Sequence, residues 1–292
     1  MDLSSQLLQY LISGVTIGSI YAIVALGFVT IHNVTGIINF AQGEFVMLGG
    51  MVGFWLLATL HLPMPVAFVL AVAVTSLVGV LLDQLALRPA KKPTVLSLII
   101  ITIGASIFLR GLAGNLWGKD AVSLPPFSGD APLLVFGATV LPQALWVLGI
   151  TVVVMLALSL FFSWTIPGKA IRACAVNRQA ARIVGIDVRK MSMVSFGISG
   201  GLGAVGGLII APITLASYDM GAMLGLKGFA AAALGGLSSG MGAVAGGFAL
   251  GIVESLGTGL ISSAYKDAIA LLVLFAILFL KPGGLIGDRS SD

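Results

Sequence analysis

A polar island interrupts the apolar sequence over residues 167–190, which read PGKAIRACAVNRQAARIVGIDVRK. The island holds six of the fifteen basic residues of the chain against one acid, Asp187, and long apolar runs flank it on both sides. Basic loops of membrane proteins stay on the cytoplasmic side and so set the orientation of the chain. The island therefore predicts a membrane fold with one sizeable cytoplasmic coupling loop.

The composition supports a membrane fold. The chain has 292 residues, of which 58% are hydrophobic and 9% are charged, whereas soluble domains carry about 25% charged residues. Continuous apolar runs, rather than alternating ones, favour helices over a β-barrel. We predict a single all-α domain over residues 1–292, a polytopic bundle of about 8–10 transmembrane segments that include broken or half helices. The net charge of +4 does not indicate nucleic acid binding, because the basic residues sit in short loops.

Nine apolar runs mark the expected helices: 7–31, 36–60, 65–87, 95–117, 141–165, 191–215, 226–238, 243–262 and 268–280. The first six and the eighth are long enough for full crossings, and the seventh and ninth are short enough to be half helices or tilted ends. Glycine pairs at i, i+4 indicate close helix packing. Such pairs include Gly14/Gly18, Gly203/Gly207 and Gly247/Gly251.

Most of the basic residues lie in three segments: residues 88–92, the island, and a tail with Lys281 and Arg289. Placing all three in the cytoplasm requires an N-terminus outside, a C-terminus inside and an external loop over residues 118–140. The sixth crossing then starts inside, whereas the first starts outside. Two related halves would form an inverted repeat, as in many transporters.

Polar residues cluster where the second apolar run begins, in GIINFAQGEFVMLGG (residues 36–50). An ionisable residue inside a membrane is costly and usually faces a cavity or a partner. We therefore expect Asn39, Phe40, Gln42, Gly43 and Glu44 to line a translocation pathway or gate. The alternative is that Glu44 lies near the membrane edge and caps a short helix.

Other charges within the apolar runs are scattered. Glu254 is a second pathway candidate, with pairing to a base or a helix N-terminus as the alternative, while Lys227 and Arg110 are expected to extend towards the membrane surface. His32 and His61 lack metal-ligand spacing, and no catalytic set or phosphate-binding loop is present. The sequence thus predicts neither an enzyme nor a cofactor or metal site, and any ATP must be bound by another chain.

Residues 170–184 of the island have the pattern of one amphipathic helix, which Gly185 would end. Its basic residues are expected in solvent: Arg172, Arg178 and Arg182. Its apolar residues are expected against the protein: Ile171, Ala175, Ile183 and Val184. The pattern favours a docking element, and the alternative is a loop that only sets topology.

Several blocks resemble one known family, the LivH-type permease subunits of ABC importers for branched-chain amino acids. The blocks are residues 14–31, 36–50, 172–190, 226–254 and 265–287. The resemblance implies a multi-pass subunit of the bacterial inner membrane that works with a second related permease. Two cytoplasmic ATP-binding subunits and a periplasmic substrate-binding protein would complete the importer.

The segment QAARIVG (residues 179–185) is similar to the EAA-x-x-x-G signature through which such permeases dock their ATPases, with Gln179 in place of the glutamate. The expected docking residues are Arg172, Asn177, Gln179, Ala180, Ala181, Arg182, Gly185 and Ile186. The expected substrate is a branched-chain or other apolar amino acid. Relatives that carry urea, amides or aromatic acids look alike, and the arrangement of the spans alone would also suit a stand-alone secondary transporter.

Overall fold

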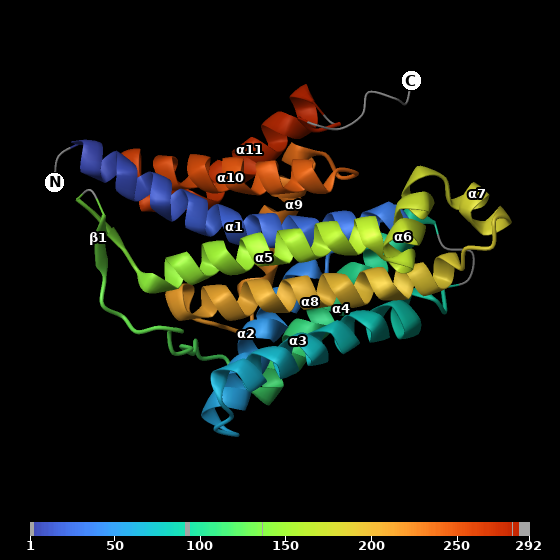
Figure 1. The fold of residues 1–292 in the computed structure, drawn as a ribbon, viewed down its shortest axis with the longest axis horizontal. Helices are drawn as coiled ribbons and strands as arrows, with labels where there is room; N and C mark the ends of the chain where they lie inside the picture. Colours follow the sequence, from blue (N-terminus) through green and yellow to red (C-terminus); the bar gives the residue numbers. More distant parts are fainter. Residues whose placement is uncertain (1–2, 91–93, 136, 282, 286–292) are drawn as a thin grey trace.

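The computed structural model describes residues 3–90, 94–135, 137–281 and 283–285. Lys91, Lys92 and Arg289, which belong to the predicted basic segments, lie outside the described residues. The fold is a bundle of long helices running roughly along one axis (Figure 1). The prediction of an all-α polytopic bundle is confirmed.

The helices follow the apolar runs closely. They are α1 (Leu3–Thr35), α2 (Gln42–Ala58), α3 (Met64–Leu81), α4 (Val95–Leu116), α5 (Pro142–Trp164), α6 (Ile166–Val176), α7 (Arg178–Ile183), α8 (Val188–Thr214), α9 (Met220–Gly235), α10 (Gly240–Leu260) and α11 (Lys266–Leu280). A π-helical turn, η1 (Leu82–Leu87), extends α3, and a 3₁₀ turn, η2 (Ser263–Tyr265), precedes α11. Seven of the described segments are long and apolar enough to cross a membrane, and α2 and α9 are shorter.

Two expected lengths were wrong. The second run is not a full-length helix, because residues 36–41 are irregular and α2 begins at Gln42, leaving 17 helical residues. Gly36 adopts φ +63°, a conformation that breaks the chain direction directly after α1. The last run is longer than a half helix, since η2 and α11 together span 18 residues.

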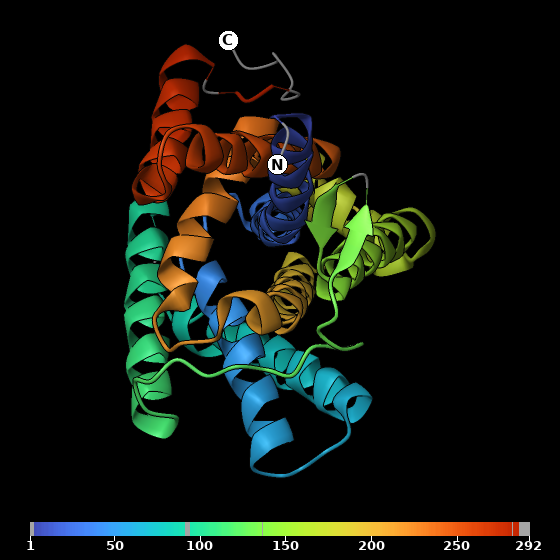
Figure 2. The same cartoon turned by 90° about the vertical axis from the view of Figure 1, so that its left-hand side faces the viewer.

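Helix α1 lies inside the bundle, with α10 on one side and α8 on the other (Figure 2). Its seam with α10 consists of small residues: a Cβ added at Gly14 would lie 2.8 Å from Cα of Ile252, and one at Gly18 would lie 2.9 Å from Cα of Phe248. Side chains larger than hydrogen therefore do not fit between these backbones. The packing role predicted for the Gly14/Gly18 pair is confirmed.

The two ends of the bundle differ in character. At one end, a short hairpin of β1 (Leu133–Val135) and β2 (Ala138–Val140) contacts the start of α1, where the Gln9 amide donates to the Thr139 carbonyl at 2.9 Å (Figure 1). At the other end lie α6 and α7, and there the Arg88 guanidinium donates to the Arg189 carbonyl at 3.1 Å. The described parts of the basic loop at 88–92 and of the island thus share one end.

The island forms two helices, α6 and α7, instead of the single helix expected over residues 170–184. Asn177 is extended (φ −158°, ψ 110°), and its side-chain oxygen accepts from the Ala180 N–H at 3.0 Å, which caps α7. Gly185 at φ +88° follows α7, so the predicted helix end is confirmed.

The break at Asn177 reorients α7 relative to α6, and this alters which apolar side chains are buried. Ile171 is buried as expected, but Ile183 and Val184, which follow the break, are exposed. Ala175 precedes the break and is also exposed, so the prediction is corrected for all three. Arg178, expected in solvent, is half-buried beside the backbone of Gly36.

Candidate functional site

The irregular segment before α2 enters the bundle with several of its polar groups hydrogen-bonded, although the side-chain nitrogen of Asn39 is buried without a partner among the described residues. The Asn39 side-chain oxygen accepts from the Ala41 N–H at 3.1 Å, and the Phe40 N–H donates to the Thr102 hydroxyl at 3.2 Å. The Gln42 amide donates to the Ser199 carbonyl at 3.2 Å, and its oxygen contacts the Ser199 hydroxyl. Asn39 and Thr102 therefore meet backbone N–H groups of the unwound segment inside the protein, where water cannot do so, and Gln42 ties the start of α2 to α8.

Glu44 lies in the first turn of α2 and is buried, with its side chain 1% exposed. One carboxylate oxygen accepts from the Ser106 hydroxyl at 2.8 Å and from the Arg110 guanidinium at 3.0 Å. Arg110 was expected to extend towards the membrane surface, and this is corrected: it points inward because a buried carboxylate needs an opposite charge.

The N-termini of α2 and α9 converge on Glu44. A Cβ built on Gly225 would lie 3.0 Å from Cα of Gly43, and one on Gly221 would lie 2.5 Å from the second carboxylate oxygen of Glu44. Each helix N-terminus carries about half a positive elementary charge, which favours an anion beside it. Glu44 is therefore stabilised by one guanidinium and by two helix ends, and only glycine permits this approach.

A second charge network surrounds Glu254 of α10. Its carboxylate accepts from the Tyr21 hydroxyl at 2.9 Å and from the Lys227 ammonium at 3.0 Å, and Lys266 lies 3.7 Å away. Lys227 also pairs with Asp267 at 2.7 Å. Glu254 thus has the basic partner that sequence analysis left open, whereas Lys227 is buried in this pair rather than extended outwards as expected.

Sequence analysis missed Tyr21, Lys266 and Asp267 as members of this network. The available signal was the pair of opposite charges at the start of the last apolar run, which α11 places beside Lys227. The network is balanced, with two ammonium and two carboxylate groups. The two expected pathway carboxylates, Glu44 and Glu254, lie in separate networks.

The predicted docking residues divide by exposure. Ala181 is buried and Ile186 is half-buried against the bundle. The remaining ones are exposed: Arg172, Asn177, Gln179, Ala180, Arg182 and Gly185. Within the described ranges, no three His, Cys, Asp or Glu side chains gather as metal ligands would.

A family model and several curated relatives match nearly the full length of the chain. A family model described as the branched-chain amino acid transport system / permease component matches residues 10–278. The high-affinity branched-chain amino acid transport system permease protein LivH of Escherichia coli K12 is 33% identical, over 96% of this chain and 95% of its own length. BraD of Pseudomonas aeruginosa is 32% identical over the same shares. The probable LivH of Methanocaldococcus jannaschii is 30% identical over 92% of this chain and 89% of its own length.

Removing the ammonium of Lys227 should destabilise the protein. We expect Lys227→Met to lower the free energy of unfolding by about 3 kcal/mol, because Glu254 would stay buried with Lys266 as its nearest remaining base. Denaturant unfolding of the purified protein in detergent measures this value. Lys119→Met, at an exposed lysine, is the control. Equal stability of the two variants would contradict the prediction. The double variant Lys227→Met, Glu254→Leu should recover part of the lost free energy of unfolding, because it also removes the buried carboxylate.

Proposed function

Because the chain belongs to the branched-chain amino acid transport permease family, we propose that it forms the translocation pathway of an ATP-driven importer together with a second, related permease. The chain is a multi-pass permease subunit of the inner membrane. The match of the family model across residues 10–278 carries the proposal. The proposed substrates are branched-chain or other apolar amino acids, which the names of the relatives support.

The proposed pathway passes the junction of α2 and α9. It is lined by Asn39, Phe40, Gln42, Gly43 and Glu44. Glu254, in the second network, is a further proposed pathway residue. Broken helices whose N-termini meet inside a bundle recur at transporter substrate sites, because their free N–H groups attract anions. The glycine contacts between Gly43, Gly221 and Gly225 support this place. A small relative shift of α2 and α9 would open or close the junction.

The proposed contact with the ATP-binding subunits is α7 and the segment that follows it. Ile183 and Val184 are 85% and 75% exposed, and Val176 at the end of α6 is 88% exposed. Exposed Arg172 and Arg182 flank them. An apolar patch with a basic rim is typical of a protein interface. The half-buried Arg178 beside Gly36 supplies a route from this contact to the irregular segment before α2.

The proposed orientation places this end of the bundle in the cytoplasm. The shared position of the island and of Arg88 supports it, because basic segments stay inside. The N-terminus and the loop over residues 118–140 are then outside, and the C-terminus is cytoplasmic. A periplasmic substrate-binding protein would deliver the amino acid to the hairpin end.

Reconstitution tests the proposed function directly. The chain should be placed in proteoliposomes with the second permease, the two ATP-binding subunits and the binding protein, and the uptake of labelled leucine measured. We expect uptake that requires ATP and every subunit. Uptake by this chain alone, driven by an ion gradient and indifferent to ATP, would replace the proposal by a stand-alone secondary transporter. Uptake of urea or amides but not of leucine would overturn the proposed substrate class.

A charge placed in the exposed patch of α7 should disrupt docking. Ile183→Glu should reduce copurification of the ATP-binding subunits with this chain about tenfold and lower leucine uptake accordingly, since a central apolar contact is worth 1–2 kcal/mol. The matched control for copurification is Leu134→Glu in β1, which is 79% exposed at the opposite end, away from the proposed contact with the ATP-binding subunits. Unchanged copurification in Ile183→Glu would remove α7 from the interface.

A further inference from the structure

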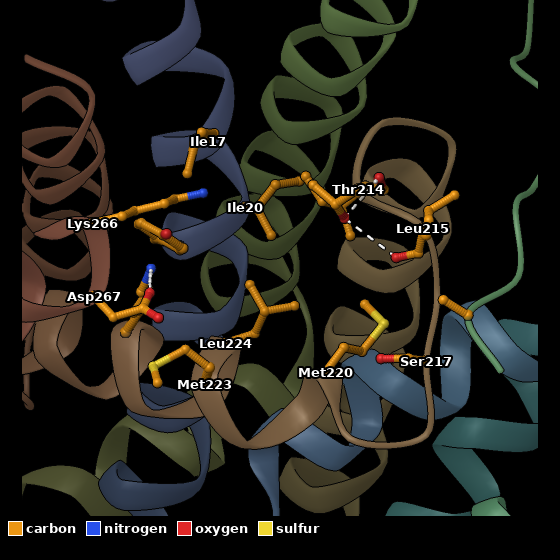
Figure 3. Close-up of a pocket in the computed structure, with 14 residues that line it drawn as sticks. Ile17, Ile20, Thr214, Leu215, Ser217, Met220, Met223, Leu224, Lys266 and Asp267 are labelled. Carbon is orange, nitrogen blue, oxygen red and sulfur yellow. Dashed lines mark hydrogen bonds and ion pairs between the residues drawn. The ribbon is translucent and has the colours of Figure 1, made fainter. Parts of the chain in front are cut away.

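A cavity of about 280 Å³ opens at the hairpin end of the bundle, next to the Glu254 network. Its walls come from α1, the end of α8, α9, the start of α11 and the segment that joins α8 to α9 (Figure 3). Ala121 also lines it, and the neighbouring Val122 forms a β-bridge with Ala216 of the joining segment. The cavity is distinct from the junction of α2 and α9 proposed as the pathway.

One wall of the cavity is charged and balanced. Lys227 and Glu254 are buried against each other, with side chains 5% and 1% exposed. The side chains of Lys266 and Asp267 are 41% and 55% exposed, and both line the cavity. Lys227 pairs with both Glu254 and Asp267, and the accessible parts of this wall are the ammonium of Lys266 and the carboxylate of Asp267. Figure 3 shows them together, with Leu215 and Ser217 across the cavity.

The rest of the lining is largely apolar. Ile17 and Ile20 of α1 face Met220, Met223 and Leu224 of α9, and the two methionine side chains can adjust to ligands of different shape. A recessed apolar space with a few converging polar groups is the usual form of a small-molecule site. This space offers three features together: an anion, a cation and an apolar surface.

We propose that this cavity binds a zwitterionic apolar amino acid on its way into the pathway. The ligand's ammonium pairs with Asp267, its carboxylate pairs with Lys266, and its side chain packs against Ile17, Met220 and Leu224. Asp267 can turn from Lys227 to the ligand because Lys227 keeps Glu254 as its partner. The inference rests on the proposed function and assigns it a substrate site at the hairpin end.

The charge pattern also predicts selectivity. A ligand with only an ammonium or only a carboxylate can make just one of the two ion pairs that a zwitterion makes with Lys266 and Asp267, so it gains less binding energy. Isoamylamine and isocaproate are such ligands, because each keeps the branched apolar chain of leucine and one of its two charges. Both should bind more weakly than leucine.

Cysteine labelling tests the site. Cys174 is the single cysteine of the chain; it is buried, and burial raises the pKa of its thiol. In a Cys174→Ala background, Met223→Cys is therefore the single thiol of this chain. The labelling uses the reconstituted complex without ATP. A membrane-impermeant maleimide should label the reporter. Leucine at about ten times its Kd should slow labelling roughly tenfold, because only empty sites react, whereas isoamylamine and isocaproate at the same concentration should slow it far less.

Adding Asp267→Asn to the reporter should abolish the protection by leucine. Asp130→Asn, at an exposed carboxylate outside the cavity, should retain the protection and serves as the control. A structural role of Asp267 alone would change stability but not protection by leucine. A complex that imports leucine while leucine gives no protection, or protects equally with Asp267→Asn, overturns the site and leaves the proposed function standing. A complex that does not import leucine overturns the proposed function itself.

Discussion

A charge inside an apolar bundle must be neutralised within the protein, and this constraint organises the interior. Glu44 recruits Arg110 from α4 and the N-termini of α2 and α9. Glu254 recruits Lys227, and through it Asp267 at the start of α11. These contacts join segments that are distant in sequence. An isolated buried pair seldom adds stability over apolar residues, and we propose that both networks serve transport.

Glycine provides the space in which these pairs form. Gly14 and Gly18 bring α1 against α10, and thereby bring Tyr21 and Glu254 within hydrogen-bonding distance. Gly221 leaves room for the carboxylate of Glu44 at the start of α9. Close backbone packing and buried charge are therefore two parts of one arrangement. A larger side chain along these seams would separate the charged partners as well as the helices.

Much of the fold could be predicted because apolar length and glycine spacing are local signals. The helix ends at Trp164 and Leu116 and the packing of Gly14/Gly18 follow from them. The ion pairs Arg110–Glu44 and Lys227–Glu254 could not be predicted, because a single sequence does not reveal which helices are neighbours. The break at Asn177 was missed for a different reason. The helical pattern of residues 170–184 continues through the break. The new helix starts there because the Asn177 side chain caps it, and such a local hydrogen bond competes with helix continuation without changing the apolar pattern.

The central claim is that the Glu44–Arg110 pair takes part in transport and does not only stabilise the start of α2. A double-mutant cycle of Glu44→Gln, Arg110→Gln and both together, read out as ATP-driven leucine uptake by the reconstituted complex, measures this. The account predicts that each single change lowers uptake about tenfold and that the double variant is no worse than either, because coupled partners are not additive. Normal uptake in Glu44→Gln with only a loss of thermal stability would contradict it.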